Sequence, residues 1–194
     1  MNLLLLLVAL LSSIPFGSIQ HLGDIHSDGS VHTFCTIWAV NVEGMIRWIT
    51  AAHCIERGAD GKVDDTIKYV IGNKRANLIK LDVDKDLAMF LGPGAKGLQI
   101  ALGEASVGQK VFSFGYFWAQ SGVYIEGVAS IPNEGDAVFN LTAGPGASGS
   151  PVLTEGNIVV GVMQFTACKS MVCPIVAGAT VKELREFLFT TRLK

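Results

Sequence analysis

Short runs of apolar and β-branched residues, broken by polar turns, follow one another along residues 30–178. Most runs are too short for a helix and are rich in residues that strands favour. The pattern predicts strands over 31–42, 45–50, 66–71, 76–83, 87–91, 109–114, 116–124, 126–131, 137–141, 152–153, 158–165 and 175–178. Such a series is typical of an antiparallel all-β protein.

The segment Gly92-Pro93-Gly94-Ala95-Lys96-Gly97 interrupts this series near its middle. Glycine and proline clusters of this kind connect structural units. We therefore expect a first barrel over 19–92, a linker over 93–103 and a second barrel over 104–194. Apolar residues at helical spacing predict a terminal helix: Val181, Leu184, Phe187 and Leu188. The expected fold is all-β, with two six-stranded antiparallel barrels and a short C-terminal helix.

An apolar run over residues 3–11 begins the chain. It is too short to span a bilayer comfortably and matches the core of a secretory signal. We expect residues 1–18 to be a signal peptide, with an uncleaved membrane anchor as the alternative. The protein would then be secreted or otherwise exported, or it would touch a membrane only through this segment.

Composition narrows the classes of function. Hydrophobic residues make up 49% of the 194 residues and charged residues 16%, which favours a packed core over disorder. The net charge is −2 and no run of lysine or arginine marks a nucleic-acid footprint. We expect no cofactor, because there is no phosphate-binding loop, and no metal, because paired Cys-x-x-Cys spacing is missing.

The four cysteines are Cys35, Cys54, Cys168 and Cys173. They allow three pairings, and their positions alone do not choose among them. In an exported chain we expect disulfides, and Cys168 and Cys173 are close enough to staple one loop. The alternative is a set of buried thiols in a reducing compartment.

The stretch Gly144-Pro145-Gly146-Ala147-Ser148-Gly149-Ser150-Pro151 surrounds serine with glycine. Glycines let the backbone adopt unusual conformations and leave N–H groups exposed to a developing negative charge. This setting suits a nucleophilic serine, for which Ser148 and Ser150 are the candidates. A serine needs a histidine to take its proton and a third group to orient that histidine.

Three blocks supply these groups: Trp48-Ile49-Thr50-Ala51-Ala52-His53-Cys54, Asp86-Leu87-Ala88-Met89-Phe90 and Gly146-Ala147-Ser148-Gly149-Ser150-Pro151. In this order they resemble the signature blocks of the chymotrypsin-like serine proteases, closer in form to viral and bacterial members than to animal zymogens. The resemblance implies two six-stranded barrels with a catalytic triad at their interface. It also implies hydrolysis of peptide bonds through an acyl-enzyme, and a viral polyprotein is an alternative context.

The resemblance gives each motif residue a role. His53 would exchange the proton as base and acid, Asp86 would orient it, and Ser148 would attack the carbonyl. The backbone N–H groups of Gly146 and Ser148 would form the oxyanion hole. Residues of the same types that do not occupy the motif positions are Ser150, Asp82, Asp84, His21, His26 and His32.

The residue before the predicted nucleophile and the cysteines near the motifs lead to further expectations. In animal members an aspartate before the nucleophile pairs with an N-terminus released by cleavage. Here that position is Ala147, so we expect a site that forms without this activation step. The resemblance also implies a disulfide between Cys35 and Cys54. Cys168 and Cys173 match no family pair so directly, and we expect them to shape the loop beside the substrate pocket.

By the same resemblance, Thr142 would lie at the base of the pocket for the side chain before the cut bond. A neutral hydroxyl cannot neutralise a buried Lys or Arg, so we expect a preference for small, apolar or uncharged polar side chains. Gln164, Phe165 and Thr166 would line the wall and contact a protein or peptide substrate. Viral relatives that cut after Gln or Glu usually add a wall histidine, and this wall has none.

Two alternatives compete with this interpretation. A lipase or esterase would need glycine two residues after the nucleophile, where Ser150 stands, and its triad would run Ser, Asp, His. A catalytically silent binding module with the same fold is the second alternative, since fold does not guarantee function. The complete set of His53, Asp86 and Ser148 favours the enzyme.

Overall fold

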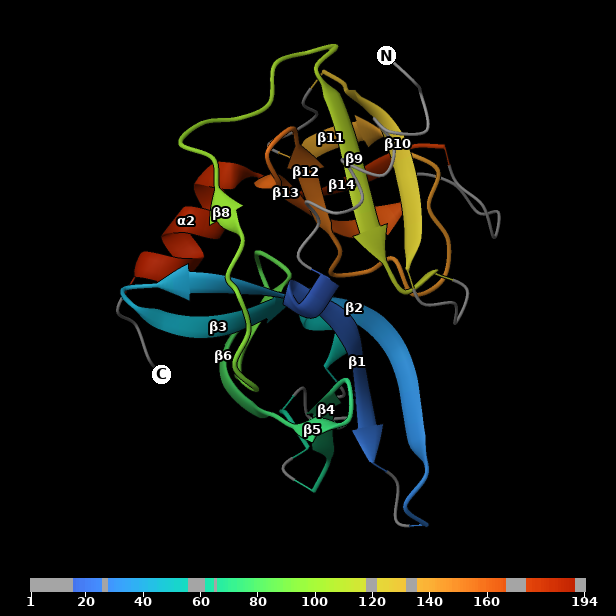
Figure 1. The fold of residues 1–194 in the computed structure, drawn as a ribbon, viewed down its shortest axis with the longest axis vertical. Coiled ribbons are helices and arrows are strands. Elements are labelled where there is room, and N and C mark those ends of the chain that lie inside the picture. Colours follow the sequence, from blue (N-terminus) through green and yellow to red (C-terminus); the bar gives the residue numbers. More distant parts are fainter. Residues whose placement is uncertain are drawn as a thin grey trace.

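The computed structural model describes residues 16–25, 28–55, 62–64, 66–117, 122–131, 136–166 and 174–190. In these residues the chain forms two seven-stranded sheets, one from each half of the sequence, and a C-terminal α-helix, α2 (Val181–Phe189). Figure 1 shows the two sheets as separate curled units, with α2 beside them. The predicted all-β fold of two antiparallel barrels and a terminal helix is confirmed.

The first sheet has the strand order β5-β4-β1-β2-β3-β7-β6, and all its neighbours are antiparallel. Strands β4 and β6, from opposite sides of this order, lie in contact, so the sheet curls toward a barrel. Its strands are β1 (Ile19–Ile25), β2 (Val31–Val42), β3 (Met45–Thr50), β4 (Lys68–Ile71), β5 (Lys74–Arg75), β6 (Asn77–Asp82) and β7 (Leu87–Leu91).

The second sheet has the order β12-β9-β10-β11-β14-β13-β8, and an additional pairing of β12 with β13 closes the ring. Its strands are β8 (Gln99–Ile100), β9 (Lys110–Gly115), β10 (Val123–Ala129), β11 (Ala137–Asn140), β12 (Pro151–Thr154), β13 (Ile158–Thr166) and β14 (Val176–Ala179). The two-residue strands β5 and β8 each add one strand to a barrel body of six. The predicted six strands therefore correspond to each barrel without its two-residue strand.

Two strand predictions are wrong, the second only in part. The sequence-based series began at residue 30 and missed β1, which pairs with both β2 and β4. Its polar residues and Gly23 resemble a loop, but a Cβ at Gly23 would lie 2.4 Å from the His32 carbonyl oxygen, so close strand contact requires glycine there. Of the strand predicted over 116–124, Tyr116, Phe117 and Gly122 lie outside any strand, Val123 and Tyr124 belong to β10, and residues 118–121 lie outside the described residues.

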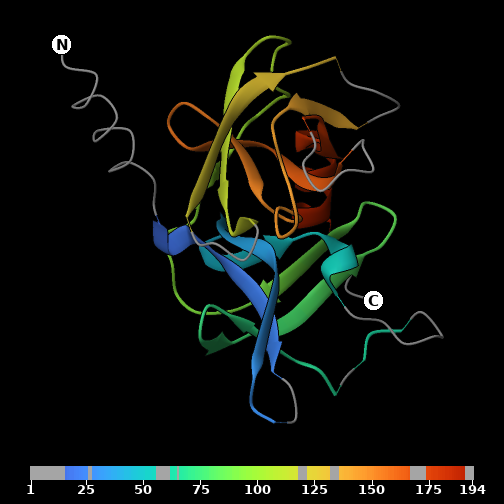
Figure 2. The ribbon, with the colours of Figure 1, turned by 90° about the vertical axis from the view of Figure 1, so that its right-hand side faces the viewer.

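The hydrophobic core has three parts, one inside each barrel and one between them. The part between the barrels includes Trp38 and Ile49 from the first sheet, Phe114 and Val162 from the second, and Phe187 from α2. Its members are almost entirely removed from solvent. Because this shared core holds the two barrels in a set arrangement, residues from both can form one site (Figure 2).

Helix α2 begins at a capping box, in which the Thr180 side chain accepts from the Glu183 N–H and the Glu183 side chain accepts from the Thr180 N–H. Its buried face consists of the four apolar residues that predicted the helix. At its other end, the Lys80 ammonium of β6 donates to the carbonyl oxygens of Phe187 and Thr190. The helix therefore contacts both barrels.

Most of the predicted signal peptide or anchor, residues 1–15, lies outside the described residues. Its last three residues, Phe16–Ser18, form a short 3-10 turn that leads into β1. Among the described residues, no helix is long and apolar enough to cross a membrane.

Candidate active site

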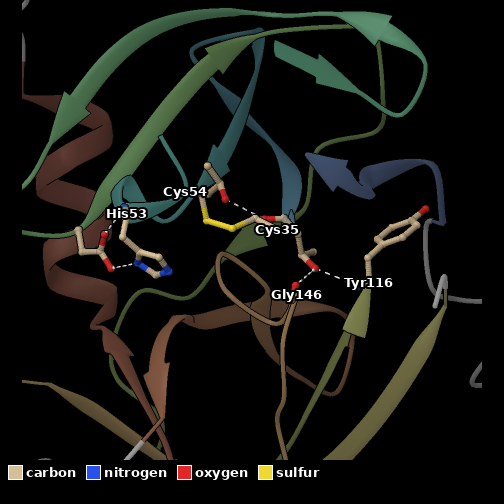
Figure 3. Close-up of a disulfide and its surroundings, with 8 residues drawn as sticks. Cys35, His53, Cys54, Tyr116 and Gly146 are labelled. Carbon is tan, nitrogen blue, oxygen red and sulfur yellow. Dashed lines mark hydrogen bonds and ion pairs between the residues drawn. A yellow bond between two sulfur atoms is a disulfide. The ribbon is translucent and has the colours of Figure 1, made fainter. Parts of the chain in front are cut away.

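His53 and Asp86 form a pair on the first barrel. His53 lies in the 3-10 turn Ala52–Cys54 that follows β3, and Asp86 lies directly before β7. The His53 Nδ1 and the Asp86 Oδ2 are 2.7 Å apart, and the His53 backbone N–H donates to Asp86 Oδ1 at 2.7 Å (Figure 3). A carboxylate only accepts, so in the neutral imidazole Nδ1 carries the hydrogen and Nε2 keeps a lone pair that can accept a proton from a hydroxyl.

The two side chains remain reachable, because the His53 side chain is 43% exposed and that of Asp86 is 28% exposed. The two other acidic candidates on this segment take no part in the pair. Asp82 instead accepts from the Lys85 backbone N–H and lies 3.5 Å from the Lys85 ammonium. Asp84 is exposed. Of Asp82, Asp84 and Asp86, only Asp86 therefore binds His53 in this structure.

The backbone of Asp86 adopts a positive φ of 48°, which is uncommon for a residue other than glycine. The buried amide of Gln164, on β13 of the second barrel, donates to the carbonyl oxygens of Lys85 at 2.6 Å and Asp86 at 2.9 Å. The resemblance implies a place for Gln164 in the wall of the substrate pocket, and nothing in the sequence indicates this contact. These two hydrogen bonds from Gln164 therefore stabilise the turn that carries the Asp86 carboxylate.

The loop over residues 144–150 lies on the second barrel and is ordered by its own backbone. The N–H groups of Ala147, Gly149 and Ser150 donate to the carbonyl oxygens of Gly144, Met163 and Ala147, respectively. Among the described residues, no hydrogen bond uses the N–H of Gly146 or of Ser148. The two N–H groups predicted to form the oxyanion hole are therefore not engaged by another described residue.

Thr36 of β2 joins this loop to the first barrel. Its backbone N–H donates to the Ser148 carbonyl oxygen at 2.9 Å, and its hydroxyl donates to the Gly146 carbonyl oxygen at 2.9 Å. The approach is so close that a Cβ at Gly149 would lie 2.3 Å from the Thr36 carbonyl oxygen. The sequence gives no direct signal for this role of Thr36, whose one indication is its place beside Cys35.

Ser148 is half-buried on this loop, while its rival Ser150 is fully buried. Access therefore favours Ser148 as the nucleophile. Within the part of the chain that the structure describes, no hydrogen bond joins the Ser148 hydroxyl to His53. Catalytic hydrogen bonds are often long without substrate and shorten when one binds.

A disulfide joins Cys35 of β2 to Cys54, the residue after His53, as the resemblance implied. It ties the turn that carries His53 to the strand that carries Thr36 (Figure 3). The Cys35, Cys54 and His53 ligand atoms lie within 4.8 Å of one another, but the disulfide leaves no thiolate to bind a metal. Cys168 and Cys173 lie outside the described residues.

The predicted specificity residues lie near the loop in sequence and on β13. Thr142 follows β11 and is exposed. Phe165 and Thr166 end β13, and only their backbone is described. Ala147, at the position of the zymogen aspartate, is 4% exposed and packs in the apolar core of the second barrel.

Two antiparallel barrels, a histidine–aspartate pair on one and a glycine-rich serine loop on the other define a serine protease of the chymotrypsin-like class. The model of the trypsin-like peptidase domain matches residues 35–162, which is more than half of the chain. The chain therefore belongs to the trypsin-like peptidase family. The comparison with curated proteins gave no match.

Solved proteases share this fold at low sequence identity. The Rv3671c protease from M. tuberculosis, in its active form, superposes with a TM-score of 0.74 at 16% identity, over 100% of this chain and 88% of that one. The HtrA-type protease AlgW with a decapeptide gives 0.72 at 14% identity, over 93% of this chain and 66% of AlgW. AlgW with a tripeptide gives 0.70 at 16% identity, over 91% and 61%.

Proposed function

We propose that this protein is a serine endopeptidase that hydrolyses peptide bonds through an acyl-enzyme. The observation that carries the proposal is the pair of bonds by which Asp86 holds His53, because they set the tautomer that a general base needs. The available N–H groups of Gly146 and Ser148 support it further. Membership of a peptidase family supports the same chemistry.

In the proposed reaction, the Ser148 Oγ attacks the scissile carbonyl carbon while its proton moves to the His53 Nε2. The N–H groups of Gly146 and Ser148 bind the oxygen that becomes negative. The bond from carbon to nitrogen then breaks as His53 returns the proton to the leaving amine. A water molecule then gives a proton to His53 Nε2 as its oxygen adds to the acyl carbon. The bond from that carbon to Ser148 Oγ breaks, and His53 returns the proton to Oγ.

We also propose that the site needs no activating cleavage. Ala147 is buried among apolar side chains, where a charged partner would be costly to place. The loop is instead held by neutral hydrogen bonds, among them those from Thr36. Export of the protein is a further proposal, supported by the disulfide between Cys35 and Cys54, since disulfides persist in oxidising compartments.

A peptide is the proposed substrate. AlgW, which shares this fold, was solved with a decapeptide and with a tripeptide. Strand β13 would pair with an extended peptide here. Thr142 offers no charge for a lysine or arginine side chain, so we expect cleavage sites in a mixed peptide library to lack these residues before the cut bond.

Labelling with a fluorophosphonate tests the proposal. The full chain should become labelled as it is expressed, without prior proteolysis, and the Ser148→Ala variant should not. Ser150→Ala is the matched control and should retain the label. Labelling that survives in Ser148→Ala would assign the nucleophile to another residue, and a folded wild-type chain that takes up no label would support the silent binding module instead.

A further inference from the structure

Thr36 lies on the first barrel, yet its hydrogen bonds go to the catalytic loop of the second. It is fully buried on β2, directly after Cys35. Its hydroxyl donates to the Gly146 carbonyl oxygen at 2.9 Å and accepts from the Tyr116 backbone N–H at 3.0 Å. A carbonyl only accepts and an amide N–H only donates, so the direction of the hydroxyl hydrogen is set without ambiguity.

The backbone of Thr36 adds a second connection to the loop. Its N–H donates to the Ser148 carbonyl oxygen at 2.9 Å. Its own carbonyl oxygen accepts from the buried Thr50 hydroxyl at 2.8 Å, which holds Thr36 to β3. One residue thus binds the carbonyl oxygens of both Gly146 and Ser148. Figure 3 shows the bond at Gly146.

The bond from the Thr36 hydroxyl holds a glycine, Gly146, whose backbone has few conformational restrictions. Gly146 has a φ of 88°, and a Cβ there would lie 2.2 Å from the Tyr116 carbonyl oxygen. Glycine is therefore required, but glycine by itself leaves the peptide planes free to rotate. The Ser148 N–H shares a peptide plane with the Ala147 carbonyl oxygen, which accepts from the Ser150 N–H at 3.0 Å. The bonds from Thr36 hold the peptide planes on either side of this one.

We propose that Thr36 is a positioning residue that orders the oxyanion hole from the opposite barrel. The inference rests on the proposed peptidase function and extends it to a residue that contacts neither substrate nor nucleophile hydroxyl. Oxyanion-hole donors stabilise charge that develops in the transition state, so their misplacement lowers kcat more than it raises KM. Loss of the hydroxyl should therefore slow the chemistry and leave substrate binding nearly unchanged.

The test compares Thr36→Val, which keeps the shape and loses the hydroxyl, with Thr36→Ser, which keeps the hydroxyl. We expect Thr36→Val to lower kcat by roughly 10-fold to 100-fold with KM within about twofold, and Thr36→Ser to restore most of the rate. Ser113→Ala is the matched control, because Ser113 is also fully buried and donates to the Pro151 carbonyl oxygen at 2.7 Å without a bond to residues 146–148.

The outcomes separate the inference from the proposed function. Wild-type turnover that Ser148→Ala abolishes must be measured first, and a folded wild type without turnover defeats the proposed function itself. If wild type turns over while Thr36→Val keeps its kcat, or while Ser113→Ala loses as much, Thr36 has no positioning role. If Thr36→Val does not fold, Thr36→Cys replaces it, because a thiol is a weak donor, and a kcat equal to that of Thr36→Ser would overturn the inference.

Discussion

Replacing Asp86 with asparagine should disable His53 without removing it. The Asp86 carboxylate accepts from two groups of His53, the backbone N–H and Nδ1–H, each at 2.7 Å. Asparagine has one acceptor oxygen and one NH₂ donor. If the oxygen keeps the backbone N–H, the NH₂ faces Nδ1 and forces that nitrogen to accept. The hydrogen of the imidazole then lies on Nε2, which cannot take a proton from Ser148.

The opposite orientation is blocked, because the NH₂ would point its hydrogens at the His53 backbone N–H. The amide therefore selects the unproductive tautomer. In a Ser-His-Asp protease this substitution lowers kcat about 10⁴-fold, equivalent to about 5.4 kcal/mol of activation free energy. We expect a fall of the same order here, with little change in stability because the side chain keeps its shape.

The assay measures kcat and KM on a peptide chosen from a mixed library, with thermal unfolding measured in parallel. Asp84→Asn is the matched control, since Asp84 is exposed on the same turn. A folded Asp86→Asn variant that retains kcat within about 10-fold of wild type would refute the assigned role. An equal loss in Asp84→Asn would point to a general electrostatic effect of the turn.

Two further predictions concern how the site is held. Gly149→Ala should destabilise the fold and abolish labelling, because its Cβ would lie 2.3 Å from the Thr36 carbonyl oxygen. Gly156 is the control, because it has the same φ of 82° and no close contact for a Cβ. Gly156→Ala should lower the free energy of unfolding, measured in urea, by only about 1–2 kcal/mol. Equal effects of the two substitutions would show that the close approach is unimportant. Replacing both Cys35 and Cys54 with serine should lower the free energy of unfolding by about 3 kcal/mol for a sequence separation of 19. A loss below about 1 kcal/mol would contradict the structural importance of this crosslink.

Local patterns predicted most of the secondary structure. Residues 43 and 44 form a tight turn between β2 and β3 with positive φ values of 53° and 82°, and the apolar and β-branched runs on either side of that turn predicted both strands. The apolar spacing of α2 likewise predicted the helix. These features depend on neighbours in sequence, so they are visible without the fold.

Strand β1 shows where local patterns fail. Its residues include His21, Gly23 and Asp24, which are typical of a loop, yet it lies between β2 and β4. The strand is stabilised by pairing on both sides and by burial of Ile19 and Leu22. Pairing with a strand distant in the chain overrides local propensity, and the sequence carries no direct record of that pairing.

In the candidate site, too, some residues could be predicted from the sequence, and others were found only in the structure. The motifs singled out His53, Asp86 and Ser148, because the chemistry of each residue shows in its type and immediate setting. The structure decided which groups hold them: Gln164 reaches the Asp86 carbonyl oxygen across 78 positions of sequence, and Thr36 reaches Gly146 across 110. Neither contact has a local signature, because a single amide or hydroxyl gains its role only when two packed barrels bring a carbonyl oxygen within hydrogen-bond distance.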